Sequence, residues 1–232
     1  MADYKNHKVK KLNQQYQVVS HWEVTANIYD MCLITPSEVA VVVNENANNT
    51  HEVQFIKVTK SQLTPGRKLK LQHECSGIAH HQGELFITSG TAVFKYTLTG
   101  KLVCRLYEDR SADYTLWKCA VTPTGDKLYI ISLWQHKLHT LARDGTLLAT
   151  LTDPALVWPR GLHVTPAGQV LVCGSLSYTV LQVNMEGESK LGATLYTGRD
   201  GLWYPLSVCY CSTTSSIIVG QGNNIILVFR VE

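Results

Sequence analysis

The chain has 232 residues, 45% of them hydrophobic and 17% charged, and a formal net charge of +3. This composition excludes a disordered chain, and the charge is smaller than that of a dedicated nucleic-acid-binding domain. No stretch approaches the roughly 18 consecutive apolar residues of a membrane span, and the first residues contain no apolar signal core. We therefore expect a cytoplasmic protein without a membrane contact.

Cysteine usage points to the same compartment. The seven cysteines are an odd number, and most lie in apolar, strand-like stretches. Buried free thiols in a reducing compartment explain this pattern better than disulfides do. Cys209 and Cys211 form a C-x-C pair, but neither a second pair nor a His pair at zinc-site spacing accompanies them. The sequence predicts no metal and no cofactor.

In chain order, a strand-like stretch at residues 9–24 precedes the first of five similar apolar segments. The segments recur every 43 to 46 residues, at 39–43, 85–89, 128–132, 171–175 and 217–221. A repeat of about 40 to 45 residues built from short strands is typical of the blades of a β-propeller. Pro- and Gly-containing turns separate four predicted strands within each copy.

We predict an all-β fold in which residues 1–232 form a single domain, a five-bladed β-propeller of four-stranded antiparallel blades. The last copy lacks a fourth strand, so we expect the N-terminal strand to pair with it and close the ring. Closure would remove two exposed sheet edges. The predicted blades span about 27–74, 75–117, 118–159, 160–205, and 206–232 together with 9–24.

The blades resemble the NHL repeat, found at the C-terminal end of many tripartite-motif ubiquitin ligases. Residues 159–164 (PRGLHV) match the opening of the family blade, and residues 76–79 and 119–121 match it in part. Residues 224–229 resemble its third strand and residues 143–145 a turn. This chain has Thr122, Thr165 or His80 where the family usually carries Asp, and five predicted blades where most members have six. The resemblance implies recognition of protein or RNA.

The predicted binding face lies where the segments leading into the blades meet the loops between second and third strands. By resemblance, we expect a protein partner there, selected as a substrate for a tripartite-motif-like ubiquitin ligase. Single-stranded RNA is the alternative, because aromatic and basic side chains together suit bases and phosphates. The candidate binding residues are Lys118, Trp134, Gln135, His136, Lys137, Arg160, Tyr178, Tyr204, Asn223 and Asn224.

Three tryptophans recur at equivalent positions, just before the first strands of their blades. They are Trp117, Trp158 and Trp203. A repeated aromatic position is more often a packing position than a binding platform, since each blade must bury the same seam. We expect these residues to pack between blades, with their indole N–H groups bonded to backbone.

Two other functions were weighed against recognition. A metal-dependent propeller hydrolase would need several ligands in the first strands, and only His163 could ligate there. No nucleophile elbow, phosphate-binding loop or partnered carboxylate pair is present, so we predict no enzyme activity. A lectin with five equal sites would need equal loops, but the loops differ in length and chemistry.

Overall fold

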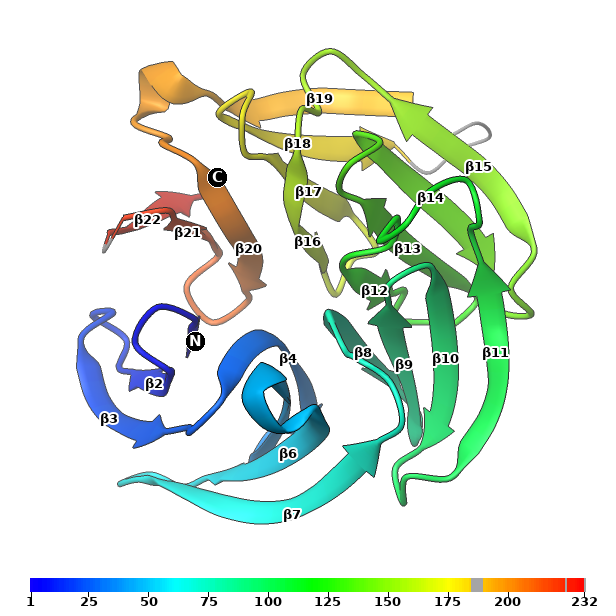
Figure 1. Cartoon of the computed structure of the whole chain (residues 1–232). Coiled ribbons are helices and arrows are strands. Elements are labelled where there is room, and N and C mark those ends of the chain that lie inside the picture. The colour runs from blue at the N-terminus through cyan, green and yellow to red at the C-terminus, as the bar shows by residue number, and fades with distance from the viewer. Residues whose placement is uncertain (185–189, 224, 232) are drawn as a thin grey trace. The chain divides into compact units, whose positions relative to one another are not determined.

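The computed structural model describes residues 1–184, 190–223 and 225–231, which are almost entirely β-structure (Figure 1). They form 22 strands and two short 3-10 helices, η1 (Asn46–Asn48) and η2 (Gly198–Asp200). No helix among these residues is long and apolar enough to cross a membrane. The chain divides into two compact units, Met1–Glu108 and Asp109–Glu232.

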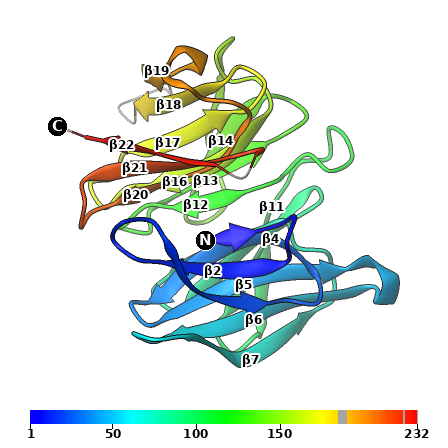
Figure 2. The same ribbon diagram turned by 90° about the vertical axis from the view of Figure 1, so that its left-hand side faces the viewer.

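The first unit contains three antiparallel sheets, each with its strands in chain order. Figure 2 shows β5, β6 and β7 side by side in the second of these sheets. The sheets consist of β1 (Ala2–Asp3), β2 (Lys8–Leu12) and β3 (Val18–Glu23); β4 (Asn27–Thr35), β5 (Glu38–Glu45), β6 (Thr50–Val58) and β7 (Leu63–Leu71); and β8 (Gly77–His81), β9 (Glu84–Ser89), β10 (Ala92–Thr97) and β11 (Leu102–Glu108).

The second unit also contains three antiparallel sheets in chain order, two of four strands and a last one of three (Figure 1). They consist of β12 (Cys119–Val121), β13 (Lys127–Ser132), β14 (Lys137–Ala142) and β15 (Leu147–Thr152); β16 (Pro159–Val164), β17 (Val170–Gly174), β18 (Thr179–Asn184) and β19 (Lys190–Tyr196); and β20 (Pro205–Cys211), β21 (Ser216–Gln221) and β22 (Ile226–Arg230).

The five repeated apolar segments lie at the second strands of their sheets, β5, β9, β13, β17 and β21. β5, β13 and β17 are buried over nearly their whole length. In β5 and β17 the side chains are apolar on both faces because neighbouring sheets of the same unit cover both sides. Such a strand is a nearly continuous apolar run, whereas a strand with one wet face alternates.

The core of each unit lies between successive sheets. In the first unit, one cluster joins Phe55 of β6 to Ile78 and Ile87 of the next sheet. In the second unit, Tyr129 and Leu138 pack with side chains of β17 and β18. A fully buried side chain of this size contributes about 1.5–3 kcal/mol by its removal from water. The sheets therefore hold together through their apolar faces.

The prediction of five blades is wrong, because the chain forms six sheets. The predicted strand exchange is wrong as well: β1, β2 and β3 make a sheet of their own, and the last sheet consists of β20, β21 and β22. The region taken as one composite blade, 206–232 with 9–24, is therefore two separate three-stranded sheets. β1 also places residues 2–3 in the sheet, before the expected start at residue 9.

The N-terminal sheet was missed because its strands lack the repeated apolar pattern. β2 reads KVKKL, and Val9 is its one buried residue. The exposed Val18 and Val19 begin β3, whose side chains are half-buried or exposed. The apolar pattern marks second strands that are buried over most of their length, and a sheet with few buried apolar residues does not show it.

All seven cysteines are free. Cys75, Cys119 and Cys173 are buried, whereas Cys209 is exposed and the other three are half-buried. Burial raises the pKa of Cys75 to about 12, so this thiol is held neutral. The prediction of core thiols therefore applies to three of the seven.

Candidate functional site

The second unit brings the segments before its first strands together with the loops between its second and third strands. The Trp158 N–H donates to Nδ1 of His136 at 2.9 Å, and the Ser175 N–H donates to the Trp158 carbonyl at 3.1 Å. In the last sheet, the Gly222 N–H donates to the Tyr204 carbonyl at 2.9 Å. We call this surface the loop face; it comprises residues 117–118, 133–137, 157–160, 175–178, 203–204 and 222–223.

Aromatic side chains pair across the loop face. The rings of Trp134 and Trp158, from neighbouring sheets, lie with their centroids 5.0 Å apart. Tyr178 meets Tyr204 edge to face at 5.1 Å, and Tyr204 meets Trp203 in the same way at 4.7 Å. Trp134 and Trp203 remain 58% and 50% exposed. Two groups of rings therefore present apolar surface to solvent from a packed base.

The backbone holds several of these bulky residues in the left-handed region. The φ angles of His136, Trp158, Tyr178 and Tyr204 are 56°, 56°, 53° and 46°. Side chains with a Cβ rarely adopt this conformation, which costs about 1–2 kcal/mol relative to the right-handed region. Strained residues of this kind cluster at functional sites, where the surrounding structure compensates for them.

Gln135 and Lys137 are engaged inside the protein. Nε2 of Gln135 donates to Oγ of Ser111 at 2.5 Å, and Nζ of Lys137 donates to Oε1 of Gln135 at 3.0 Å. Oγ of Ser111 in turn donates to Asp109 at 2.6 Å. Burial alone would raise the pKa of Asp109, but the hydrogen bonds from Ser111 outweigh it and keep that pKa low. This network fixes the Trp134 loop against residues 109–115.

The two candidate cations before the first strands differ in their surroundings. The Arg160 guanidinium lies over the Trp117 ring, 5.8 Å from its centroid. Such a cation–π contact contributes about 0.5–1 kcal/mol at an exposed site. Lys118 is half-buried, and its carbonyl accepts the Ile131 N–H at 2.8 Å.

The remaining candidates lie at the other end of the face. Tyr178 hydrogen-bonds to Tyr204, which raises the pKa of Tyr178. Asn223 is exposed, and its Oδ1 accepts the Ile225 N–H at 3.0 Å. Asn224 lies outside the described residues. The structure thus places nine of the ten predicted residues on one face, while Gln135 and Lys137 are partly occupied by internal bonds.

The three recurrent tryptophans do not share one role. Trp117 and Trp158 pack against the core cluster of their unit, as predicted. Trp203 is half exposed instead, and Nε1 of Trp158 is buried without a hydrogen-bond partner among the described residues. The sequence therefore shows that the three tryptophans occupy equivalent positions. Whether each side chain is buried or exposed depends on the neighbouring loops. Exposed Leu176 and Ile225, in or beside the loop face, were missed because single apolar loop residues carry no pattern.

His163 of β16 has no metal-like surroundings. Burial lowers the pKa of His163 to about 4, and its Nε2 has no hydrogen-bond partner among the described residues. A neutral, unpaired imidazole differs from the hydrogen-bonded core histidine that is usual in strands. No group of three or more His, Cys, Asp or Glu side chains that could hold a metal occurs in the described part of the chain.

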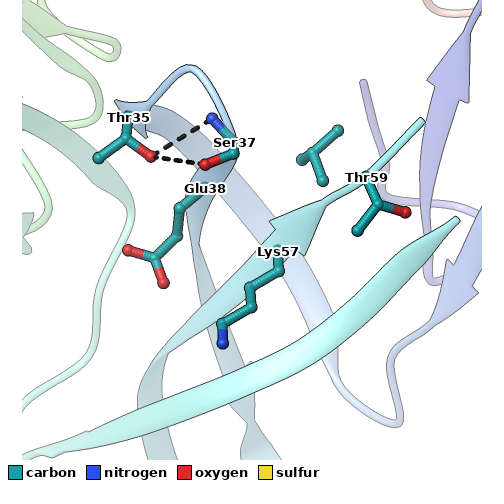
Figure 3. A pocket seen from close by; sticks show the side chains of 6 residues that line it. Thr35, Ser37, Glu38, Lys57 and Thr59 are labelled. Carbon is teal, nitrogen blue, oxygen red and sulfur yellow. Dashed lines mark hydrogen bonds between the residues drawn. The ribbon is translucent and has the colours of Figure 1, made fainter.

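A shallow pocket of about 390 Å³ lies in the first unit, at the turns of the second sheet (Figure 3). Glu38 and Lys57, opposite each other on β5 and β6, carry its charges. The Thr35 hydroxyl accepts the Ser37 N–H at 3.3 Å. Binding pockets are usually lined by apolar and aromatic groups, whereas three of the six residues that line this one carry small hydroxyl groups and none is aromatic. It is lined by Thr35, Ser37, Glu38, Lys57, Val58 and Thr59.

Comparison with known proteins relates the chain to others by structure and not by sequence. No protein-family model matches the sequence, and none of the curated proteins is similar to it. A functionally unknown protein from Desulfotomaculum acetoxidans matches 99% of this chain and 74% of its own, with a TM-score of 0.69 at 12% identity. Catalytically inactive virginiamycin B lyase from Staphylococcus aureus, solved with quinupristin, matches 99% and 79%, with 0.64 at 14%.

A luciferin-regenerating enzyme is also similar, over 94% of this chain and 77% of its own, with a TM-score of 0.67 at 11% identity. The prediction that the chain is not an enzyme is overturned by these neighbours. They include enzymes with the same fold, so neither the architecture nor the missing motifs excludes catalysis. At 11–14% identity the likeness shows the fold alone, which is that of a β-propeller with six blades of three or four strands.

Proposed function

We propose that this chain is a protein-recognition propeller that binds its partner on the loop face of residues 109–232. The observation that carries the proposal is the exposed aromatic surface of Trp134 and Trp203, backed by Trp158, Tyr178 and Tyr204. Tryptophan and tyrosine dominate the energetic centres of protein interfaces, because each buries a large, rigid, amphipathic surface.

The likeness to NHL propellers refines this proposal. The sequence predicted five blades, whereas most members of that family have six. The six sheets of the structure remove this difference. In this reading the chain selects substrates for a tripartite-motif-like ubiquitin ligase. A cytoplasmic location fits the free cysteines, because oxidising compartments favour disulfides.

The charge of the second unit favours protein over RNA. Residues 109–232 contain nine Lys and Arg and nine Asp and Glu, so the whole net charge of +3 lies in residues 1–108. Binding to a nucleic acid depends on phosphate neutralisation by cations. On the loop face, Lys137 is bonded to Gln135 and Arg160 covers Trp117, which leaves the exposed aromatic surface as the main feature.

The test is cross-linking of the full chain in cell extract, with the linked peptides identified by mass spectrometry. We expect partner peptides linked to the loop face. The double variant Trp134→Ala/Trp203→Ala should weaken binding of the identified partner at least about tenfold, because a central aromatic contributes about 2–4 kcal/mol. Val103→Ala, an exposed side chain of β11, is the matched control.

Two outcomes would reject the proposal. If the double variant binds the partner as the parent chain does while melting at the same temperature, the loop face is not the interface. If the parent chain instead binds a single-stranded RNA homopolymer with an affinity that falls steeply between 50 and about 200 mM salt, RNA is the ligand.

A further inference from the structure

β15 is an exposed edge strand without charges. It is the outermost strand of the sheet β12-β13-β14-β15 and reads LLATLT. Leu147 and Leu148 are 45% and 52% exposed, and Thr150 and Thr152 are exposed as well. An edge strand presents unpaired N–H and C=O groups, so one that is apolar and uncharged is a template for another strand.

The corresponding last strands of the other sheets carry the devices that block such pairing. β7 contains Pro65 and three basic residues, β11 contains Arg105 and Glu108, and β22 ends in Arg230. Charges and prolines on edge strands prevent edge-to-edge association. β15 has a register irregularity at Leu148, opposite Thr140 and Leu141, but no charge or proline. Of the six last strands it alone has no charged residue, since β3 contains Glu23 and β19 contains Lys190.

We propose that β15 pairs antiparallel with β15 of a second copy of this chain and forms a two-fold dimer. A second copy fits because an uncharged strand can face itself without like charges opposite each other, which β7 could not do. The neutral second unit adds no long-range repulsion between copies. A two-fold contact is also closed, so it stops at a dimer instead of growing into a filament.

The two-fold symmetry restricts the register. Opposed residues of an antiparallel pair point to the same face of the sheet, and an axis perpendicular to the sheet preserves faces. One residue near the middle of β15 must therefore lie opposite its own copy. With the axis at Thr150 or at Leu151, the face that carries Thr150 and Thr152 meets the same face of the second strand. Leu148 lies at the register irregularity and does not follow this alternation. The contact is small, so we expect micromolar affinity.

Charge exchange on this face tests the proposal, with sedimentation equilibrium as the readout. Thr150→Lys/Thr152→Lys and Thr150→Glu/Thr152→Glu each place like charges opposite each other, so each variant alone should dimerise at least about tenfold more weakly. An equimolar mixture of the two should recover dimers within about threefold of the parent affinity. Leu102→Lys/Val103→Lys on β11 is the control and should leave the affinity unchanged.

Both variants lose the hydrogen bond between Thr150 and Nδ1 of His139, which is 2.9 Å long. If both variants dimerised weakly only because they had lost stability, mixing them would not restore dimer formation. The mixture therefore distinguishes an effect on strand pairing from an effect on folding. A parent chain that is monomeric at about 100 μM overturns the proposal. So does a dimer that both variants leave intact, or a mixture that stays monomeric while the parent dimerises.

Discussion

At the residue scale, the environment of a side chain and not its type decides what it does. Trp158 and Trp203 occupy equivalent positions, yet one packs against the core of its unit and the other is half exposed. His136, with its φ of 56°, accepts a backbone N–H from the neighbouring sheet. His163 is half-buried, and its buried Nε2 has no hydrogen-bond partner among the described residues. Of these two histidines of one unit, His136 thus accepts a hydrogen bond at Nδ1, whereas His163 has none at Nε2 within the described part of the chain.

His163 should make the protein sensitive to acid. Its pKa falls from 6.5 to about 4 on folding, so between these values the unfolded chain binds the proton more tightly. Stability contributed by the neutral ring is complete above about pH 6.5 and is lost as the pH falls toward 4, by roughly 2–3 kcal/mol.

Urea unfolding of the parent chain and of His163→Leu at pH 7 and pH 4.5 measures this effect. The variant should lose distinctly less stability over that interval, since it has no ring to protonate at this site. An equal loss in both proteins would assign the acid sensitivity to other groups, such as His73, His80 and His139, whose burial also lowers the pKa.

At the element scale, the sheets are joined by polar clamps at the ends of second strands and by close backbone approach. Asn44, at the end of β5, donates from Nδ2 to the Cys75 carbonyl at 2.8 Å and accepts the Cys75 N–H at 3.1 Å. The Ser175 hydroxyl donates to the Pro205 carbonyl in the same way. Each clamp satisfies buried backbone groups that would otherwise cost about 1–3 kcal/mol.

At Gly161 of β16, the last two sheets of the second unit approach each other closely. A Cβ there would lie 2.8 Å from Cα of Ser207 in β20 and 2.9 Å from Sγ of Cys173. Backbone cannot move aside as a flexible side chain can, so Gly161→Ala should destabilise the protein by about 2 kcal/mol or more. Thermal and urea unfolding measure it.

The matched control is Gly198→Ala, where the nearest atom to an added Cβ is Cβ of Tyr178 at an ordinary 3.6 Å. This variant should unfold as the parent does. If Gly161→Ala were equally harmless, β16 and β20 would not pack as closely as the structure shows.

At the scale of the whole molecule, the N-terminal strands β1, β2 and β3 form a sheet that takes part in the core of the first unit. Val9 and Val24 are buried with Val39 and Val41 of β5 in one cluster, so the first sheet covers the apolar face of the second. The same unit carries the entire net positive charge, and the aromatic loop face belongs to the neutral unit. The exposed aromatic side chains and the net basic charge therefore lie in different parts of the sequence.

Val9→Asp should destabilise the first unit strongly, since it buries an unpaired carboxylate at a position that is 2% exposed. We expect a loss of about 3 kcal/mol or more. Val19→Asp, at a position that is 51% exposed in the neighbouring strand β3, should have almost no effect. Circular dichroism during thermal unfolding distinguishes the two, and a Val9→Asp protein of parental stability would contradict a structural role for this sheet.

The sequence by itself determined the all-β class and the five apolar second strands, and it led to the prediction that the candidate residues share one face. These features follow from local chemistry: strands buried on both sides must be continuously apolar, and Pro and Gly mark the turns between them. Segments such as 128–132 and 171–175 carry that pattern without reference to the rest of the chain.

Only the tertiary structure decided the number of sheets, the internal bonding of Gln135 and Lys137, and the exposure of Trp203. The N-terminal strands are polar enough to escape any pattern, and they become a sheet only because their few apolar side chains cover β5. Loop side chains find partners such as Ser111 across more than twenty residues of sequence. Contacts between segments so far apart depend on how sheets pack, and no local pattern encodes them.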